Sequence, residues 1–187
     1  LKQISSLSCF DRLIVSTEDS ELMKIAESYG FQIHSRDKKY STSEIPMSDV
    51  YKYIASEIDG EHIAWINVTN PLAQGHVYEN AVNDYLMMEE SHDCLLSVVD
   101  LKDYIFFNGK PLNFKPNPWP RSQDLEGTLA MSYVINILHR KDMIKWGSCV
   151  GSNPYFYVLD QTTSMDIDFQ IDFDFCEFIY NKRKINI

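Results

Sequence analysis

Short runs of aliphatic residues alternate with segments of helical periodicity along most of this 187-residue chain, and this alternation constrains the fold more than any other feature. Residues 12–16 and 62–68 have the composition of strands, and residues 18–29 and 48–58 place apolar side chains at helical spacing. The same alternation continues with strands at 31–34, 93–98 and 155–159 and a helix at 77–88. We therefore predict a doubly wound, mostly parallel, Rossmann-like α/β sheet with right-handed crossovers.

The two ends of the chain also carry helical patterns. A last helix is expected over residues 169–182, and it would bury one apolar face made of Ile171, Phe175, Phe178 and Ile179. Leu1, Ile4 and Leu7 have helical spacing as well, so we expect the sequence to begin partway through an element.

The middle of the chain departs from the alternation. Residues 104–114 carry Asn108-Gly109 between aromatic and aliphatic residues, which is a strong hairpin signal. Residues 115–123 contain three prolines beside Trp119, so a stiff, irregular segment is expected. We interpret residues 101–125, approximately, as an arm that projects from a single domain spanning 1–187 and serves a subunit contact.

Composition narrows the classes of function. A hydrophobic content of 44% is enough for one sizeable core, and a net charge of −10 argues against a duplex nucleic-acid binder. The four cysteines are too widely spaced for a zinc motif or a disulfide scaffold. With no membrane-spanning segment and no signal peptide in the sequence, we expect a cytoplasmic protein without membrane contact.

In such a fold, ligands bind where the carboxyl ends of the strands meet. Three polar loops are expected there, at residues 16–19, 67–72 and 166–168. Asp166 and Asp168 would point the same way if extended, and Mg²⁺ prefers carboxylates supplemented by waters and phosphates. The same acidic residues are also common at helix starts, where they cap free N–H groups, and from the motif alone capping is the stronger explanation.

Residues 10–19 followed by residues 25–30 resemble the N-acylneuraminate cytidylyltransferase (CMP-sialate synthetase) family. Further stretches fall in that family's order: Arg36 after a strand, residues 67–72 for its Gln-Pro-Thr-Ser-Pro-Leu loop, residues 121–123 for its Arg-Gln motif, and residues 166–168 for its Asp-x-Asp. The resemblance covers nearly the whole chain and implies a fold of the nucleotide-diphospho-sugar transferase type.

The resemblance implies a reaction in which the anomeric hydroxyl of a sialic-acid-like keto-sugar acid attacks the α-phosphate of CTP. A CMP-sugar and pyrophosphate would result. Asp166 and Asp168 would hold a catalytic Mg²⁺, with Asp172 as an outer helper. Arg36, Asn67 and Thr69 would contact the nucleotide, and Arg121 with Gln123 would bind the sugar acid. The family also implies a homodimer in which the arm reaches the partner's site.

Several positions depart from the family pattern. The family's opening strand and glycine-rich phosphate loop have no counterpart after Leu1, so we expect this stretch of chain to be inactive alone and the strands near Leu13 and Trp65 to lack a common neighbour. Asn67 replaces Gln, Ala73 replaces Arg, and Ala130-Met131 replaces an Asn-Gly. These changes indicate a divergent member with a shifted or different sugar, or with lost activity.

Two alternatives to this enzyme remain open. One is a non-catalytic sugar-nucleotide-binding or assembly protein on the same scaffold. The other is a different nucleotidyl- or glycosyltransferase, because folds of this type host many chemistries. Arg36 and Arg121 also have a plain interpretation as solvated surface charges.

Overall fold

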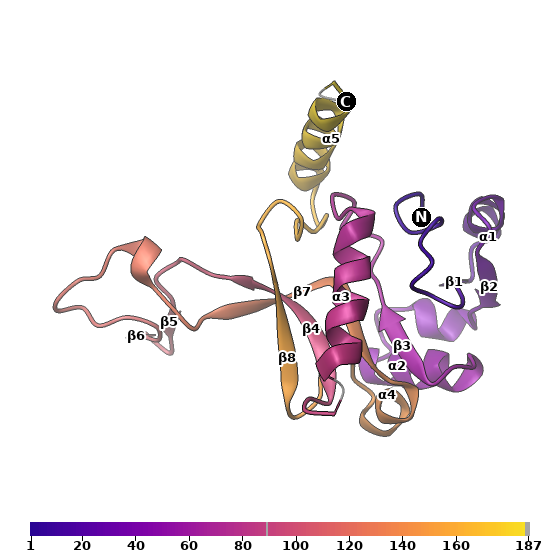
Figure 1. Cartoon of the computed structure of the whole chain (residues 1–187), viewed down its shortest axis with the longest axis horizontal. Helices are drawn as coiled ribbons and strands as arrows, with labels where there is room; N and C mark the ends of the chain where they lie inside the picture. Colours follow the sequence, from indigo (N-terminus) through magenta and orange to yellow (C-terminus); the bar gives the residue numbers. More distant parts are fainter. Residues whose placement is uncertain (89, 186–187) are drawn as a thin grey trace.

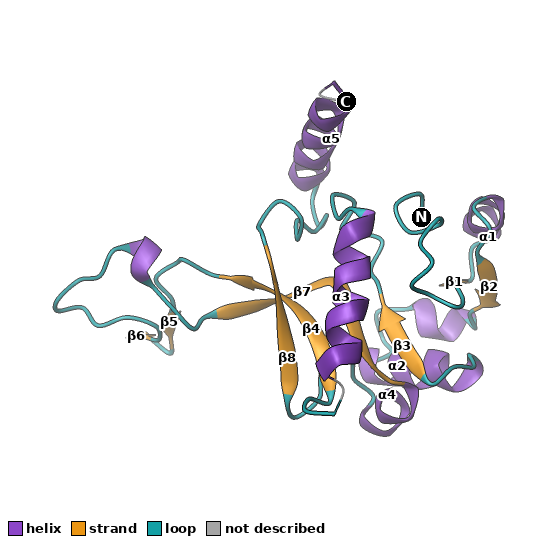
Figure 2. Cartoon of the chain, in the orientation of Figure 1, coloured by secondary structure: helices purple, strands orange, loops and turns teal. Residues whose placement is uncertain are grey.

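A computed structural model describes residues 1–88 and 90–185 and shows an α/β architecture centred on a four-stranded sheet (Figures 1 and 2). The sheet order is β3-β7-β4-β8, formed by His62–Trp65, Leu129–His139, Cys94–Asp100 and Pro154–Leu159. β4 and β8 run parallel, whereas β7 runs antiparallel to both β3 and β4. The predicted fold class is confirmed, with β7 as the antiparallel exception.

Helices cover both faces of this sheet. α3 (Gly75–Met88) packs on one face against Leu95, Ile137 and neighbouring residues. On the opposite face, α2 (Met47–Glu57) and α4 (Arg140–Trp146) pack against Leu96 and Leu138. Because successive strand residues point to opposite faces, adjacent leucines of β4 serve two different cores.

A second pair of parallel strands forms a small sheet separate from the four-stranded one. β1 (Ile14–Thr17) and β2 (Gln32–Ser35) pair in parallel and are connected by α1 (Ser20–Ser28). Within the described residues β1 has no hydrogen-bonded strand other than β2, and β3 has none other than β7. The expectation that these two strands lack a common neighbour is confirmed.

A cavity of about 1190 Å³ lies between β1 and β3 and is lined by residues of both strands. Arg12 links the two sides where the strands begin. Its guanidinium donates to the backbone carbonyl of Asp59 (3.1 Å) and to the side chain of Gln32 (2.9 and 3.0 Å). Residues of both strands therefore face a common cavity, and among the described residues no strand is hydrogen-bonded to both of them.

The expected arm projects from the sheet at the far end of β4 and β7 (Figure 1). Within the arm, β5 (Phe106–Phe107) pairs with β6 (Lys110–Pro111) around Asn108 and Gly109, both of which have positive φ angles. Phe114 makes edge-to-face contacts with Tyr104 and Trp119 in the arm, although Trp119 remains 58% exposed. The hairpin prediction is confirmed.

The last helix, α5 (Gln170–Ile185), exists as predicted, but its predicted buried face is wrong. Ile171 is 70% exposed and Phe178 is 62% exposed, and Phe175 is exposed as well. The helix instead turns Phe173, Cys176 and Tyr180 toward the cavity. Periodicity finds an amphipathic helix, but it does not determine which side of a mixed apolar surface meets the body of the protein.

The start of the chain also differs from prediction. The first residues form turns, in which the amides of Ile4 and Ser5 both donate to the carbonyl of Leu1, and no helix is assigned there. Ile4, Leu7 and Phe10 pack against the core on the α3 side of the sheet. The helical spacing of these residues thus reflects packing of an irregular segment.

A bulge in β7, opposite Ser97 of β4, is held by buried polar side chains. The pairing of β4 with β7 shifts register between Leu96 and Val98. At that point the Ser97 hydroxyl donates to the carbonyl of Ser132 (2.8 Å) and accepts from the amide of Ile135 (3.2 Å). Ser97 is fully buried, so its side chain satisfies backbone groups that the shifted ladder leaves unpaired.

Candidate functional site

The loop after β3 and the loop before α5 meet at the carboxyl edge of the sheet. The amide of Ile167 donates to the carbonyl of Thr69 (3.0 Å). The side-chain amide of Asn70 donates to the carbonyls of Ser164 and Met165, at 3.2 Å each. Segments almost a hundred residues apart are thus joined by three hydrogen bonds, which place the Asp166-Ile167-Asp168 stretch beside the Thr69-Asn70 turn.

The Asp-x-Asp stretch is an irregular loop, not an extended strand. Among the described residues, the Oδ1 atom of Asp166 is buried without a hydrogen-bond partner. Such an oxygen is costly to bury unless a cation or water completes it. The donor set and this orphaned oxygen fit a hard divalent cation such as Mg²⁺.

Asp172 has a structural role in this loop. Its carboxylate accepts hydrogen bonds from the amides of Asp168 (3.1 Å) and Phe169 (2.8 Å) at the start of α5. This is helix capping, the explanation that favours acidic residues near helix starts. Capping therefore accounts for Asp172 but does not account for Asp166.

Arg36 lies where β2 ends and forms an ion pair with Glu18. The guanidinium contacts Glu18 Oε2 at 2.9 and 3.3 Å, and the amide of Arg36 donates to the carbonyl of Thr17. Hydrogen bonds from Ser41 and then Arg36 lower the pKa of Glu18 to about 2. A phosphate that bound Arg36 would therefore have to share this guanidinium with Glu18.

Asn67 follows β3 and is held in place by the sheet. Its amide donates to the carbonyl of Tyr133, and its side-chain oxygen accepts from the indole of Trp65 (3.0 Å). With the oxygen engaged, the side-chain NH₂ is the group suited to donate to a ligand.

Arg36, Asn67, Thr69 and Ile167 all line the cavity between β1 and β3. The three predicted nucleotide-binding residues therefore share one cavity with Ile167 of the acidic loop, whereas Asp166 and Asp168 are not among the lining residues. An arginine, an amide and a hydroxyl near a carboxylate pair can bind a nucleotide phosphate and its cation.

The predicted sugar-acid residues lie elsewhere in the chain. Arg121 and Gln123 sit on the projecting arm, and neither lines the cavity. The guanidinium of Arg121 pairs with Asp124 at 2.9 and 3.0 Å, on an exposed surface. The structure does not bring these two residues together with the others within one chain.

Two residues that contribute to the site were not predicted from the sequence. Asn70 has the sequence context of an ordinary turn residue before proline. In the structure it is buried, and its side-chain amide joins the two loops by hydrogen bonds. Ser41 belongs to a polar loop in the sequence, but its hydrogen bond lowers the pKa of Glu18 more than Arg36 does. No local pattern marks either residue, because both act through contacts distant in sequence.

Solved structures that superimpose on this chain define its fold class. The chain superimposes with a TM-score of 0.70 on 4-diphosphocytidyl-2C-methyl-D-erythritol synthase from Anaerococcus prevotii, at 12% identity, covering 96% of this chain and 83% of that one. A CMP:2-keto-3-deoxy-manno-octonic acid synthetase complexed with CTP gives a TM-score of 0.66 at 8% identity, covering 97% and 86%. The architecture is therefore the mixed α/β fold of these nucleotide-sugar and cytidylyl synthases.

Proteins similar in sequence point to a narrower group than the solved structures do. N-acylneuraminate cytidylyltransferase A of Danio rerio is 25% identical over 177 residues, which is 90% of this chain and 40% of that protein. An N-acylneuraminate cytidylyltransferase of Escherichia coli is 26% identical over 93% of this chain and 43% of its own length. Post-translational flagellin modification protein B of Campylobacter coli is 22% identical over 98% of this chain and 83% of its length.

The resemblance to the N-acylneuraminate cytidylyltransferases is confirmed by these relatives. The chain spans less than half the length of the Danio rerio and Escherichia coli proteins that it matches. No protein-family model matches the sequence. Within the described residues, no helix is long and apolar enough to cross a bilayer.

Proposed function

We propose that the full-length polypeptide is a cytidylyltransferase that couples CTP to a sialic-acid-like keto-sugar acid. The observation that carries this proposal is the meeting of the Asp166–Asp168 loop with the Thr69-Asn70 turn, beside a cavity that Arg36 also lines. The names of the relatives support the choice of substrates.

In the proposed reaction, the anomeric oxygen of the sugar acid forms a bond to the α-phosphorus of CTP. The bond from that phosphorus to the bridging oxygen of the β-phosphate breaks, pyrophosphate leaves, and the hydroxyl proton is released. Catalysis of such a displacement depends on in-line positioning and on neutralising phosphate charge. Mg²⁺ bound by Asp166 and Asp168 would supply part of that neutralisation.

The protein's own residues would position the substrates. Asn67, fixed by Trp65, presents its NH₂ at the end of β3, and Thr69 offers a hydroxyl in the turn that follows. Arg36 would contact phosphate while Glu18 limits its freedom. Arg121 and Gln123 would bind the sugar carboxylate of a neighbouring subunit's site in a homodimer, because they lie on the arm and away from this chain's own cavity.

Pyrophosphate release from the full-length polypeptide with CTP, Mg²⁺ and a panel of nine-carbon keto-sugar acids tests the proposal. We expect Asp166→Asn and Asp168→Asn each to lower kcat about 100-fold or more, as loss of a charge-stabilising group commonly does. Asp174→Asn is the matched control, since Asp174 is exposed on α5 and accepts a hydrogen bond from Gln170.

Tight CTP binding without turnover on any acid of the panel would instead favour the non-catalytic sugar-nucleotide-binding protein. Equal activity in the Asp166, Asp168 and Asp174 variants would remove the acidic loop from the mechanism.

A further inference from the structure

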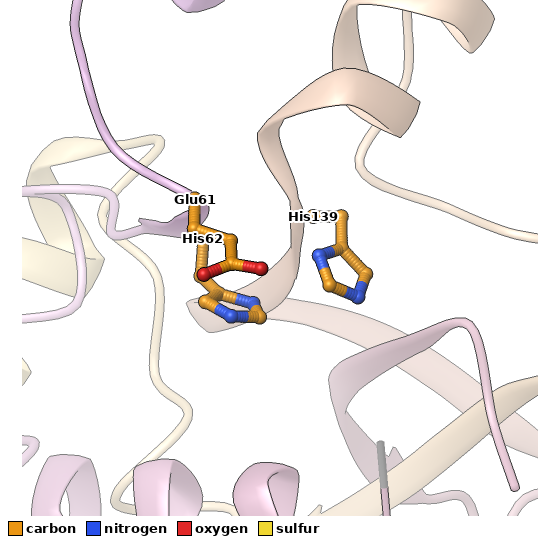
Figure 3. Close-up of side chains that lie close together, drawn as sticks. All are labelled: Glu61, His62 and His139. Carbon is orange, nitrogen blue, oxygen red and sulfur yellow. The ribbon is translucent and has the colours of Figure 1, made fainter. Parts of the chain in front are cut away.

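A second cluster of ligating side chains lies at the opposite end of β3 from the candidate nucleotide site. Glu61, His62 and His139 each offer one ligand atom, and these three atoms lie within 4.8 Å of one another (Figure 3). His62 begins β3 and Asn67 follows its other end, so about five extended residues, roughly 16 Å, separate the two sites. The cluster is therefore distinct from the acidic loop.

The sheet itself brings the two histidines together. His62 of β3 is the register partner of His139 of β7, and directly opposed residues of antiparallel strands project from the same face. Their ring centroids are 4.5 Å apart. The amide of Arg140 also donates to the carbonyl of Glu61 (2.9 Å), which fixes the backbone of Glu61 against the end of β7.

Tyr85 of α3 supplies an outer contact of the kind that orients metal-bound imidazoles. Its hydroxyl lies 3.0 Å from Nδ1 of His62 and the residue is buried. If Nδ1 carries the proton and donates to Tyr85, Nε2 of His62 is the nitrogen that can coordinate a cation.

From these contacts, we propose that Glu61, His62 and His139 form a binding site for a first-row transition-metal dication, with Zn²⁺ as the reference ion. Two imidazoles and a carboxylate are a ligand set that suits such ions and leaves a fourth position for water. Hard Mg²⁺ is a poor match for imidazole nitrogen, so this site and the acidic loop would select different cations.

The side chains need only small movements to close around an ion. Ligand atoms of a tetrahedral zinc site lie about 3.3 Å apart, so the present separations must contract by about 1.5 Å at most. The imidazoles already interact with neighbouring groups, and metal binding would exchange some of those contacts for coordination bonds.

An entry path exists because Glu61 is exposed and both histidines are half-buried. Glu61 and His62 also line the cavity between β1 and β3, which opens this end of the strand to solvent. A net charge of −10 favours the approach of cations. A bound ion would pin the start of β3 to the end of β7.

Titration of the chelator-treated full chain with ZnCl₂ by calorimetry tests the site. We expect one Zn²⁺ per chain, and at least tenfold weaker binding in both Glu61→Gln and His139→Gln. His76→Gln, which removes an exposed imidazole on α3, is the matched control and should bind as the wild type does. The melting temperature should rise with Zn²⁺ but not with equal Mg²⁺.

Co²⁺ provides a second measurement that does not depend on a folded variant. The wild-type chain should develop the intense visible absorption of a low-coordinate Co²⁺ site, and excess Zn²⁺ should abolish it. Failure to bind Zn²⁺ saturably, or equal affinity in all three variants, would overturn the proposal. None of these measurements uses CTP, so the outcome is independent of the proposed enzymatic activity.

Discussion

The strands β4 (Cys94–Asp100) and β1 (Ile14–Thr17) both contain adjacent aliphatic residues, but their surroundings differ. β4 is hydrogen-bonded to β7 on one side and β8 on the other, with helices on both faces. β1 is bonded to β2 and faces a cavity of about 1190 Å³ on its other side. The comparison shows that apolar composition predicts a strand in both cases, whereas backbone pairing depends on a neighbour that composition does not reveal.

The largest expected difference between the two strands comes from replacing an aliphatic residue of equal size in each. Leu95 of β4 is fully buried, and we expect Leu95→Ala to lower the free energy of unfolding by about 3 kcal/mol through lost contacts and a new void. Ile14 of β1 is half-buried beside the cavity, so Ile14→Ala should cost only about 1 kcal/mol. Urea denaturation measures both, and equal losses would mean that the cavity side of the sheet is packed as tightly as β4.

A pair of serines sharpens the comparison with polar groups. Ser97→Ala removes two hydrogen bonds to the buried bulge of β7 and should cost about 2 kcal/mol, because backbone groups of β7 are left unsatisfied. Ser16→Ala removes the contact between the Ser16 hydroxyl and Nδ1 of His34, at 2.9 Å. Ser16 lines the cavity, so water can replace its hydroxyl, and we expect a loss below about 1 kcal/mol. A larger loss at Ser16 would reverse the ranking of the two regions.

The smallest expected effect concerns pH and the loops that follow β1 and β2. Glu18 has an ordinary carboxyl pKa of 4.5 when unfolded, which hydrogen bonds from Ser41 and Arg36 lower to about 2 in the fold. Its ionised form is favoured in the folded state, so its contribution to stability is present above pH 4.5 and is lost as the pH falls toward 2. Glu18→Gln should flatten the pH dependence of stability within that window.

The NMR titration of the Glu18 carboxyl checks the same assignment directly. A midpoint near 2 that moves up in Ser41→Ala is expected, because the Ser41 hydrogen bond is the largest cause of the shift. An unchanged midpoint in that variant would show that Ser41 does not cause the shift.

Local patterns predicted the elements well because their causes are local. The helix from Ser20 has Asp19 as its cap, with hydrogen bonds to the amides of Glu21 and Leu22, and the turn at Asn108-Gly109 uses residues that accept positive φ angles. The antiparallel course of β7 was not predicted, since a strand's direction depends on the path of the preceding arm.

The candidate site was predictable only in part. The topology rule placed the loops after β3 and before α5 at the same edge, and the structure joins them. The bonds of Asn70 to residues 164 and 165, and the pairing of Glu18 with Arg36, are contacts across distant segments that spacing does not encode. The cluster of Glu61, His62 and His139 was missed for the same reason, because its third member arrives from a strand 77 residues later.

The outward side of α5 affects how the protein can be handled. Ile171 and Phe178 lie exposed along it and Phe169 is exposed just before it, and large apolar side chains in water promote self-association at high concentration. The average particle mass measured by light scattering should therefore increase with protein concentration. It should fall when Ile171 or Phe178 is replaced by a charged residue. Solutions intended for crystallisation or NMR are best prepared dilute and with such a variant as reference.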